Sequence, residues 1–478
     1  MPENEPSQEL DPIGPHLTDG APSASEAAIQ PGKAAVEAGG RRRKAALVLM
    51  IVWSVTLGLH WVAWGAWLIW GATAALAAYL VRLVLALPPA SAPPLPHDAS
   101  APFVSILVAA RNEAAAIGGT LEQLCDLDYP AHRYEVWAID DGSTDGTGAL
   151  LDAMADERAQ LQVLHRPIGA QGGKSGALNQ ALGRARGEIV AVFDADARVS
   201  PELLRWVVPQ FEAPQTGAVQ VRKAIVNATC NGWTRAQAAE MALDSYFQQQ
   251  RTAASGIGEL RGNGQFVKRR ALAQCGGWNE STLTDDLDLS LQLHLNRWNV
   301  RFLNDPAVTE EGVTALRSLW HQRNRWAEGG YQRFLDYWQS LVRSPQLGAT
   351  KRLDLLAFLV VQYLLPMAAV PDLLAALLQQ RQPLLAPLTL LLVGVSVWAT
   401  AAGLRRSQPA GAKPTPLADW ATILWGNAYM LHWVPVMAAV TARMAVQPKR
   451  LNWIKMPHQG PAQNGTSESV ACSESEGG

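Results

Sequence analysis

Two short acidic stretches combine residue types and spacing that suit chemistry on a phosphorylated substrate. In Phe-Asp-Ala-Asp-Ala, Asp194 and Asp196 follow a run of apolar, β-forming residues. Carboxylates that alternate at the end of a strand can both reach one divalent cation, and Mg²⁺ or Mn²⁺ prefers a few carboxylates plus substrate phosphates. Two like charges so close together are unfavourable unless a cation or solvent compensates them. An exposed acidic turn is the alternative interpretation.

The second stretch, Ser-Thr-Leu-Thr-Asp-Asp-Leu-Asp-Leu-Ser-Leu at 281–291, places three carboxylates among leucines. Its simplest interpretation is a helix start. Thr284 would be the N-cap, and the acids would occupy the first turn, where they complement the helix dipole. The stretch alone does not decide whether one of the acids also does chemistry.

Two further motifs could contact a nucleotide. Asp-Asp-Gly-Ser-Thr-Asp-Gly at 140–146 follows a strand-like run, and a carboxylate there could accept hydrogen bonds from a uracil or a ribose. Asp-Gly is also an ordinary turn signal. The glycine-rich run 169–182 leads into a helix at Lys174, so backbone N–H groups and this lysine could approach phosphate. It lacks P-loop spacing, and a flexible loop is the alternative.

The stretch His-Gln-Arg-Asn-Arg-Trp-Ala-Glu-Gly-Gly at 321–330 carries a possible diphosphate grip. Gln322 and Arg325 are three residues apart, so they share a helix face, and Trp326 could form a wall beside them. A solvated basic face is the alternative. The apolar residues around this stretch fit an amphipathic helix on a membrane surface, and residues 233–251 suggest a second one; the apolar set is Leu316, Leu319, Trp320, Phe334, Tyr337 and Trp338.

The elements that must position these residues alternate between strand-like and helical runs over about residues 100–345. This alternation predicts a mainly parallel, right-handed βαβ sheet. Polar groups follow the predicted strand ends each time, and the carboxyl ends of strands build the ligand crevice of open α/β sheets. We therefore expect four groups of side chains to converge at one edge: Asn112 with Glu113, Asp140 with Asp141, Arg166, and Asp194 with Asp196.

The composition indicates membrane segments, because 48% of residues are apolar and only 17% are charged. A net charge of −2 gives no overall basic character for nucleic acid. The cluster Arg41 to Lys44 precedes a long apolar run at 45–87, which suits a hairpin of two membrane helices. By the positive-inside rule, both ends of that hairpin would lie in the cytoplasm.

Apolar segments return at 353–378, 384–404 and 417–446. The first contains two prolines and could be kinked, re-entrant or interfacial. Basic residues after the second and third segments both favour the cytoplasm, which is impossible if all three cross, so the number of crossings stays open. The predicted organisation is a disordered tail at 1–40, a membrane hairpin at 45–87, an α/β domain at 100–345, C-terminal membrane or interfacial helices at 353–446, and a disordered tail at 457–478.

Four motifs in order resemble those of the inverting family 2 glycosyltransferases, which include cellulose, chitin and hyaluronan synthases. They are Asp-Asp-Gly-Ser at 140–143, Asp-Ala-Asp at 194–196, Thr-Asp-Asp at 284–286 and Gln-x-x-Arg-Trp at 322–326. The resemblance covers about residues 100–340 and implies a GT-A fold, Rossmann-like with a mainly parallel sheet, flanked by transmembrane helices. One departure is Asp285, where many relatives carry Glu; the charge is kept.

Within that family, the N-terminal hairpin and the stretch Gln-Arg-Asn-Arg-Trp-Ala-Glu-Gly-Gly-Tyr-Gln-Arg-Phe-Leu-Asp-Tyr-Trp are similar to one group of membrane enzymes. Those enzymes transfer glucose from UDP-glucose to diacylglycerol. The resemblance therefore implies transfer to the 3-hydroxyl of 1,2-diacylglycerol, on the cytoplasmic side of a multi-pass membrane protein. Neither the sugar nor the acceptor can be assigned from individual residues.

The resemblance also implies roles for single residues. Asp286 would be the general base, held ionised at neutral pH by the helix N-terminus, with Asp285 as an orienting neighbour and Asp288 as an ordinary first-turn charge. Asp194 would face the nucleotide and, with Asp196, ligate Mg²⁺ or Mn²⁺. Asp140 or Asp141, with Asn112, would hold the uridine, and Gln322, Arg325 and Trp326 would grip the diphosphate and the acceptor entrance. Glu113 and Lys174 are the other predicted contacts to the substrate, with Lys174 at phosphate.

Two other functions are compatible with these motifs. A processive polysaccharide synthase also carries Gln-x-x-Arg-Trp, but a polymer channel needs more spanning helices than the four or five predicted here. A catalytically inactive membrane scaffold that binds nucleotide-sugar is disfavoured, because every expected carboxylate position is filled.

Overall fold

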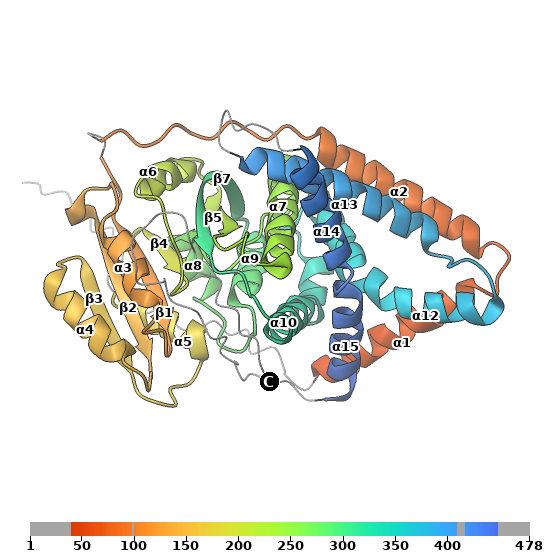
Figure 1. Ribbon diagram of the computed structural model, residues 1–478, viewed down its shortest axis with the longest axis horizontal. Coiled ribbons are helices and arrows are strands. Elements are labelled where there is room, and N and C mark those ends of the chain that lie inside the picture. The colour runs from red at the N-terminus through yellow and green to blue at the C-terminus, as the bar shows by residue number, and fades with distance from the viewer. Residues whose placement is uncertain (1–39, 98–99, 409–415, 448–478) are drawn as a thin grey trace, which may run out of the picture.

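A computed structural model of the chain describes residues 40–97, 100–408 and 416–447. An α/β domain forms one end of the molecule and a group of apolar helices forms the other (Figure 1). The predicted disordered tails fall almost wholly outside the described residues, as do Lys449 and Arg450 of the C-terminal basic cluster.

The α/β domain is built on a seven-stranded sheet of order β3-β2-β1-β4-β6-β5-β7. Only β6 is antiparallel to its neighbours, so the prediction of a mainly parallel sheet is confirmed. The strands are β1 Val104–Ala110, β2 Tyr134–Asp141, β3 Leu161–Arg166, β4 Ile189–Phe193, β5 Thr216–Ile225, β6 Gln265–Lys268 and β7 Asn299–Glu310.

Helices cover both faces of this sheet, which explains why β1 and β4 are almost continuously apolar and buried. One core contains apolar residues of the helices on the first face, α3 Ile117–Cys125, α4 Thr147–Glu157 and α6 Leu203–Val207. A second core contains those of the opposite face, α5 Gly173–Leu182, α8 Arg269–Cys275 and α9 Asp285–Leu295. Parallel strands covered in this way direct their carboxyl ends to one edge.

Two long helices, α7 Gly232–Ala253 and α10 Leu316–Arg343, lie between the sheet and the apolar helices (Figure 1). Asn231 caps α7 through a reciprocal pair of hydrogen bonds with Thr234, which fixes its first turn. Helix α10 has one strongly apolar face, and its buried aromatic residues pack against α1, α12 and α15. These helices coincide with the two predicted amphipathic stretches.

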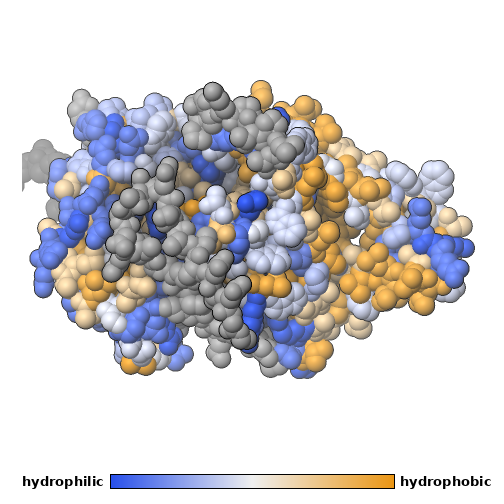
Figure 2. Space-filling model, in the orientation of Figure 1, coloured by the Kyte–Doolittle hydropathy of each residue, from blue (hydrophilic) through white to orange (hydrophobic). Residues whose placement is uncertain are grey.

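The apolar helices begin with a hairpin, α1 Arg41–Leu59 and α2 Gly65–Leu85. The first C-terminal segment forms α11 Ala349–Leu359, a π-helical turn Val360–Leu364 and α12 Leu365–Gln379, and the second forms α13 Ala386–Ser407. In the part of the chain that the structure describes, four helical stretches are long and apolar enough to cross a membrane: Gly65–Leu85, Ala349–Gln379, Ala386–Ser407 and Asp419–Val446. Figure 2 shows the apolar surface gathered over this half of the molecule.

The third C-terminal segment forms α14 Pro416–Met430 and α15 Trp433–Val446, which run across the direction of α2 and α13 (Figure 1). Trp425 Nε1 donates to the Gly232 carbonyl at the start of α7, 2.7 Å away. Arg443 forms an ion pair with Glu328 of α10, also at 2.7 Å. This segment is therefore bonded to α7 and α10, the two helices that adjoin the α/β domain.

A buried network of charges joins the α/β domain to the apolar helices. Arg251 of α7 donates to Asp354 of α11 and to Glu259, with nitrogen–oxygen distances of 2.8 Å in both cases. Glu259 also forms an ion pair with Arg333 of α10, with a distance of 2.6 Å between Arg333 Nη1 and Glu259 Oε1. Burying these charges is costly unless each one is paired, so removing a single partner would strongly destabilise the network. The pairing fixes the two parts of the molecule relative to each other.

Candidate active site

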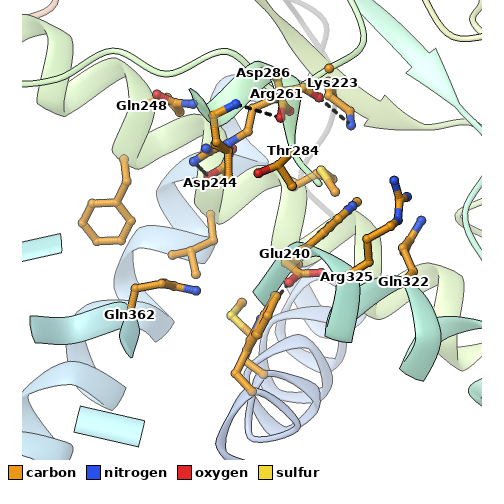
Figure 3. A pocket seen from close by; sticks show the side chains of 18 of the residues that line it. Lys223, Glu240, Asp244, Gln248, Arg261, Thr284, Asp286, Gln322, Arg325 and Gln362 are labelled. Atoms are coloured by element: carbon orange, nitrogen blue, oxygen red, sulfur yellow. Dashed lines mark hydrogen bonds and ion pairs between the residues drawn. The ribbon is translucent and has the colours of Figure 1, made fainter. Parts of the chain in front are cut away.

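A single cavity of about 1840 Å³ extends from the carboxyl edge of the sheet into the space between the apolar helices. Figure 3 shows part of this cavity, with Asp286 and Arg261 on one side and Gln362 on another. The end at the sheet is lined by acidic, basic and amide side chains. The end between the helices is lined by apolar side chains, among them Leu80, Leu83, Phe247, Phe358, Leu365, Leu390 and Val393.

Asp194 and Asp196 follow β4 and both line the cavity. Lys174 Nζ, at the start of α5, donates to Asp194 Oδ1 at 2.5 Å, and the Glu311 amide donates to Asp196 Oδ2 at 3.3 Å. Burial raises the pKa of Asp194, but the charge and hydrogen bond of Lys174 outweigh it and hold that pKa below its usual value. Asp194 is therefore an ionised carboxylate beside a positive charge.

Asp286 lies in the first turn of α9, and its Oδ1 accepts a hydrogen bond from the Leu287 amide at 2.8 Å. Burial and the neighbouring charge of Asp285 raise the pKa of Asp286 to about 6, although the Leu287 amide, Arg261 and Lys174 act in the opposite direction. The pKa is raised because desolvation and a like charge are larger effects than the hydrogen bond from the helix N-terminus. A carboxylate with a pKa near 6 is still mostly ionised at pH 7, and it accepts a proton more readily than an ordinary aspartate.

Two other residues of this stretch differ from the expectation. Thr284 occupies the predicted N-cap of α9, but its buried hydroxyl makes no capping hydrogen bond and has no partner among the described residues. Asp288 is only 3% exposed, so it is not an ordinary first-turn charge. It accepts hydrogen bonds from Asn279, Gln292 and Tyr337, and the last of these connects α9 to α10. Packing against α10 buries this turn, which the stretch itself does not reveal.

Gln322 and Arg325 extend side by side from α10 into the cavity (Figure 3). Within the described residues, neither side chain has a hydrogen-bond partner, and the Gln322 Oε1 atom is buried without one. Trp326 lies beside them, with Lys223 Nζ 5.8 Å from its ring centre. Arg323 is different, because it is 1% exposed and is paired with Glu240 and the Tyr429 hydroxyl. The helix thus directs one arginine into the cavity and fixes another in the core.

The structure divides the polar residues after β1 and β2 that were predicted to contact the substrate. Glu113 and Asp141 line the cavity, whereas Asn112 and Asp140 do not. Asn112 Oδ1 accepts from the Thr144 amide at 2.7 Å, and Asp140 Oδ1 accepts from the Ser143 amide at 2.9 Å. These two side chains therefore hold the loop that follows β2, while the other two face the substrate space.

Several residues that line the cavity were not predicted from the sequence. Lys223 of β5 pairs with Glu310 of β7 at 2.9 Å, and Arg261 pairs with Asp244 of α7 at 2.8 Å. Distant elements bring these partners together, so no local pattern indicates them. One signal was available for Arg261: it precedes Gly-Asn-Gly at 262–264, whose two glycines have φ values of 81° and 68°. Such a turn allows close backbone approach, and a Cβ at 262 would lie 3.4 Å from Asp286 Oδ2.

Known proteins resemble this chain at two levels, over the α/β domain and over most of its length. The sequence profile described as "Glycosyltransferase like family 2" matches residues 101–329. The chain is 55% identical over 425 residues to a β-monoglucosyldiacylglycerol synthase of Synechocystis sp., covering 88% of each chain. It is 51% identical over 466 residues to a synthase of the same name from Nostoc sp., covering 97% of this chain and 99% of that one.

The fold is similar to a solved structure of the mannosyltransferase PcManGT from Pyrobaculum calidifontis in complex with GDP-Man and Mn²⁺. The TM-score is 0.51 at 22% sequence identity, over 80% of this chain and 99% of the other. At this identity, the likeness establishes the fold alone.

Proposed function

The chain belongs to the family 2 glycosyltransferases, and we propose that it transfers glucose from UDP-glucose to the 3-hydroxyl of 1,2-diacylglycerol. It is a glycosyltransferase of glycolipid synthesis, since its relatives with that activity in their names match most of the chain. The observation that carries the choice of substrates is the cavity, which is polar at the sheet and apolar between the helices. A water-soluble nucleotide-sugar fits the first end, and a lipid fits the second.

The donor would lie against the polar end of the cavity. Arg325 and Gln322 present unpartnered groups there, and a guanidinium binds two diphosphate oxygens through its paired N–H donors. Lys174 adds a second positive charge beside Asp194. Glu113 and Asp141 would face the nucleoside, because they line the cavity next to the loop after β2.

Asp194 and Asp196 fit a divalent cation that is shared with the donor. Both carboxylates follow one strand and line the cavity, and Mg²⁺ is usually bound by one or two carboxylates with substrate phosphates completing its shell. When bound, Mg²⁺ or Mn²⁺ would neutralise negative charge on the diphosphate. Lys174 would then share the same cluster of charges, close to the phosphates.

The proposed reaction is a single displacement with inversion. Asp286 accepts the proton of the lipid hydroxyl as its oxygen bonds to the anomeric carbon of glucose, on the face opposite the diphosphate. The bond between that carbon and the diphosphate oxygen breaks, and UDP leaves with the electron pair. Arg325 and Lys174 stabilise the charge that develops on the leaving group, since they are already positioned at that end of the cavity. The product is a β-glucoside.

The acceptor would enter from the membrane. The apolar arm of the cavity is lined by α2, α7, α12 and α13, which offer a place for acyl chains. The basic residues Arg41 to Lys44 begin α1, and Arg405 and Arg406 end α13, so both clusters favour the cytoplasmic side. We infer that α14 and α15 lie in the interface on that side, and that the third C-terminal segment does not cross.

The test is transfer by the purified full chain in detergent–lipid micelles with radiolabelled UDP-glucose and 1,2-dioleoylglycerol. The expected product is one β-linked glucose per lipid, extractable into organic solvent, with one UDP released for each glucose transferred. A high polymer that stays in the aqueous phase would instead indicate a processive synthase. Donors with other sugars, tested in parallel, would show whether glucose is the preferred group.

A further inference from the structure

Gln362 places a polar side chain on the apolar side of the cavity. It belongs to the π-helical turn Val360–Leu364, which interrupts the apolar helical stretch Ala349–Gln379. Pro366 has no N–H to offer the Gln362 carbonyl four residues earlier, and in a regular α-helix its ring would clash with that carbonyl. The sequence thus accounts for the irregular turn. Such π turns are frequent at functional sites.

The Gln362 amide is half-buried and lines the cavity, yet within the described residues it has no hydrogen-bond partner. Its surroundings are apolar, with Phe358, Val361 and Leu365 lining the cavity on the same helical stretch. Figure 3 shows the side chain extending into the cavity from the side opposite Gln322 and Arg325. An amide in such a place needs a partner from the ligand or from water, because an unpaired polar group there is unfavourable.

Three other polar side chains that line the cavity already have partners. Gln248 bonds the Glu259 backbone in both directions, with distances of 3.1 and 3.2 Å. Asn427 donates to the Ile423 carbonyl, and Asp372 accepts from His60 and from two backbone amides. These groups have structural partners, whereas Gln362 is free to meet a ligand.

We propose that Gln362 Nε2 donates a hydrogen bond to an ester carbonyl of the lipid acceptor. This inference rests on the proposed function, in which the acceptor is a diacylglycerol. The acceptor hydroxyl must reach Asp286, and its chains occupy the apolar arm, so the ester groups lie between the two. The ester carbonyls are the strong hydrogen-bond acceptors of the lipid, and the amide offers the matching donor. The bond positions the glycerol so that its free hydroxyl faces the base.

The test compares two acceptors and two proteins. The full chain and its Gln362→Met variant are assayed with 1,2-dioleoylglycerol and with its ether analogue, 1,2-di-O-oleylglycerol, which lacks both carbonyls. We expect the wild-type protein to prefer the ester lipid in kcat/KM by about 3- to 10-fold, the range of a single net hydrogen bond. The variant should lose this preference. Its kcat/KM for the ether lipid and its KM for UDP-glucose should be unchanged.

Turnover of the ether lipid reports that the variant is folded, and Gln379→Met is the matched control. Gln379 ends α12 on the same helical stretch and does not line the cavity, so this variant should retain the preference for the ester lipid. Equal losses with both acceptors, or an unchanged preference, would overturn the role of Gln362 while leaving the proposed function intact. Absence of transfer to either lipid by the wild-type protein would overturn the proposed function and this inference with it.

Discussion

Gly329 of α10 packs directly against Thr284, the N-cap residue of α9. A Cβ at residue 329 would lie 2.5 Å from Thr284 Oγ1, which leaves no room for a methyl group. Thr284 immediately precedes Asp285 and Asp286, so the helix that carries Gln322 and Arg325 also supports the start of the helix that carries the proposed base. The contact between Gly329 and Thr284 therefore fixes the proposed base relative to the residues proposed to bind the diphosphate.

Replacing Gly329 with alanine should displace Thr284 and, with it, Asp286. We expect kcat to fall about 10-fold or more, since small misplacement of a reacting group is costly, while KM for UDP-glucose changes little. Steady-state kinetics with both substrates would measure this split. Gly119→Ala in α3 is the control, because a Cβ there meets open space, and it should keep wild-type kinetics. Full activity of Gly329→Ala would show that the contact has no role.

Asp286→Asn should abolish proton acceptance without disturbing donor binding. A positioned general base contributes about 10²- to 10⁴-fold, and we expect a loss of that size in kcat with little change in the affinity for UDP-glucose. Calorimetric titration of the variant with UDP-glucose would separate the two effects. Wild-type turnover by this variant would exclude Asp286 as the base.

The same substitution should make the protein more resistant to heat at pH 8. Burial raises the pKa of Asp286 to about 6, so the folded protein binds this proton more tightly than the unfolded chain does. The penalty of an ionised Asp286 is therefore fully present above about pH 6 and is relieved as the pH falls toward the ordinary aspartate value. We expect the apparent melting temperature of Asp286→Asn in detergent to exceed that of the wild type at pH 8, and the difference to shrink at pH 5.

The transfer rate should fall in acid, as expected for a reaction that needs an ionised base. Because Asp286 must be ionised to accept a proton, kcat/KM for the acceptor should fall with acid below a pKa of about 6, and about 10-fold per pH unit well below it. The measurement is a pH–rate profile between pH 5 and 8, at saturating donor. A value of kcat/KM that stays constant down to pH 5 would contradict the raised pKa.

Arg325 and Arg323 provide a matched pair on one helix. Arg325→Ala should lower kcat about 10²- to 10³-fold, the range seen when one stabilising donor is removed from a developing negative charge, without lowering the melting temperature. Arg323→Ala should lower the melting temperature, because it leaves the Glu240 carboxylate without its buried partner. Kinetics and thermal melts of both variants test this assignment. Equal behaviour of the two would contradict it.

Activity should require a divalent cation. Removal of metal with a chelator should abolish transfer, and added Mg²⁺ or Mn²⁺ should restore it. Asp196→Asn should require a higher cation concentration for half-maximal activity, by about 10-fold, because a carboxylate ligand is replaced by a neutral one. Full activity in the chelator would contradict the roles given to Asp194 and Asp196.

Much of the fold could be predicted, because its signals are local. The apolar runs that form β1 and β4 are nearly continuous in the sequence, and alternation with helices predicts their parallel pairing. Strand β6 is only four residues long and follows a glycine-rich turn, so its antiparallel place between β4 and β5 has no local signature. The direction of α14 and α15 depends on contacts with α7 and α10, which an apolar segment does not specify.

The residues of the site that belong to short sequence motifs could be predicted. The properties that depend on burial by distant elements could not. Asp194, Asp286 and Arg325 belong to short motifs and lie around one cavity. The burial of Asp288 and the raised pKa of Asp286 both arise from the surroundings of α9, which the chain supplies from distant elements. Gln362 is a lone polar residue in an apolar segment, and only the position of its helix relative to the cavity gives it a possible role.

The two ends of the cavity place the proposed substrates on different concentration scales. UDP-glucose would be counted per volume of water, whereas diacylglycerol would be counted per lipid molecule of the bilayer. Diluting the acceptor with an inert phospholipid at constant total amount would then slow the enzyme, although nothing in the aqueous phase has changed. The rate of glucolipid synthesis would follow the mole fraction of diacylglycerol in the membrane. The activity of the enzyme would therefore respond to membrane composition.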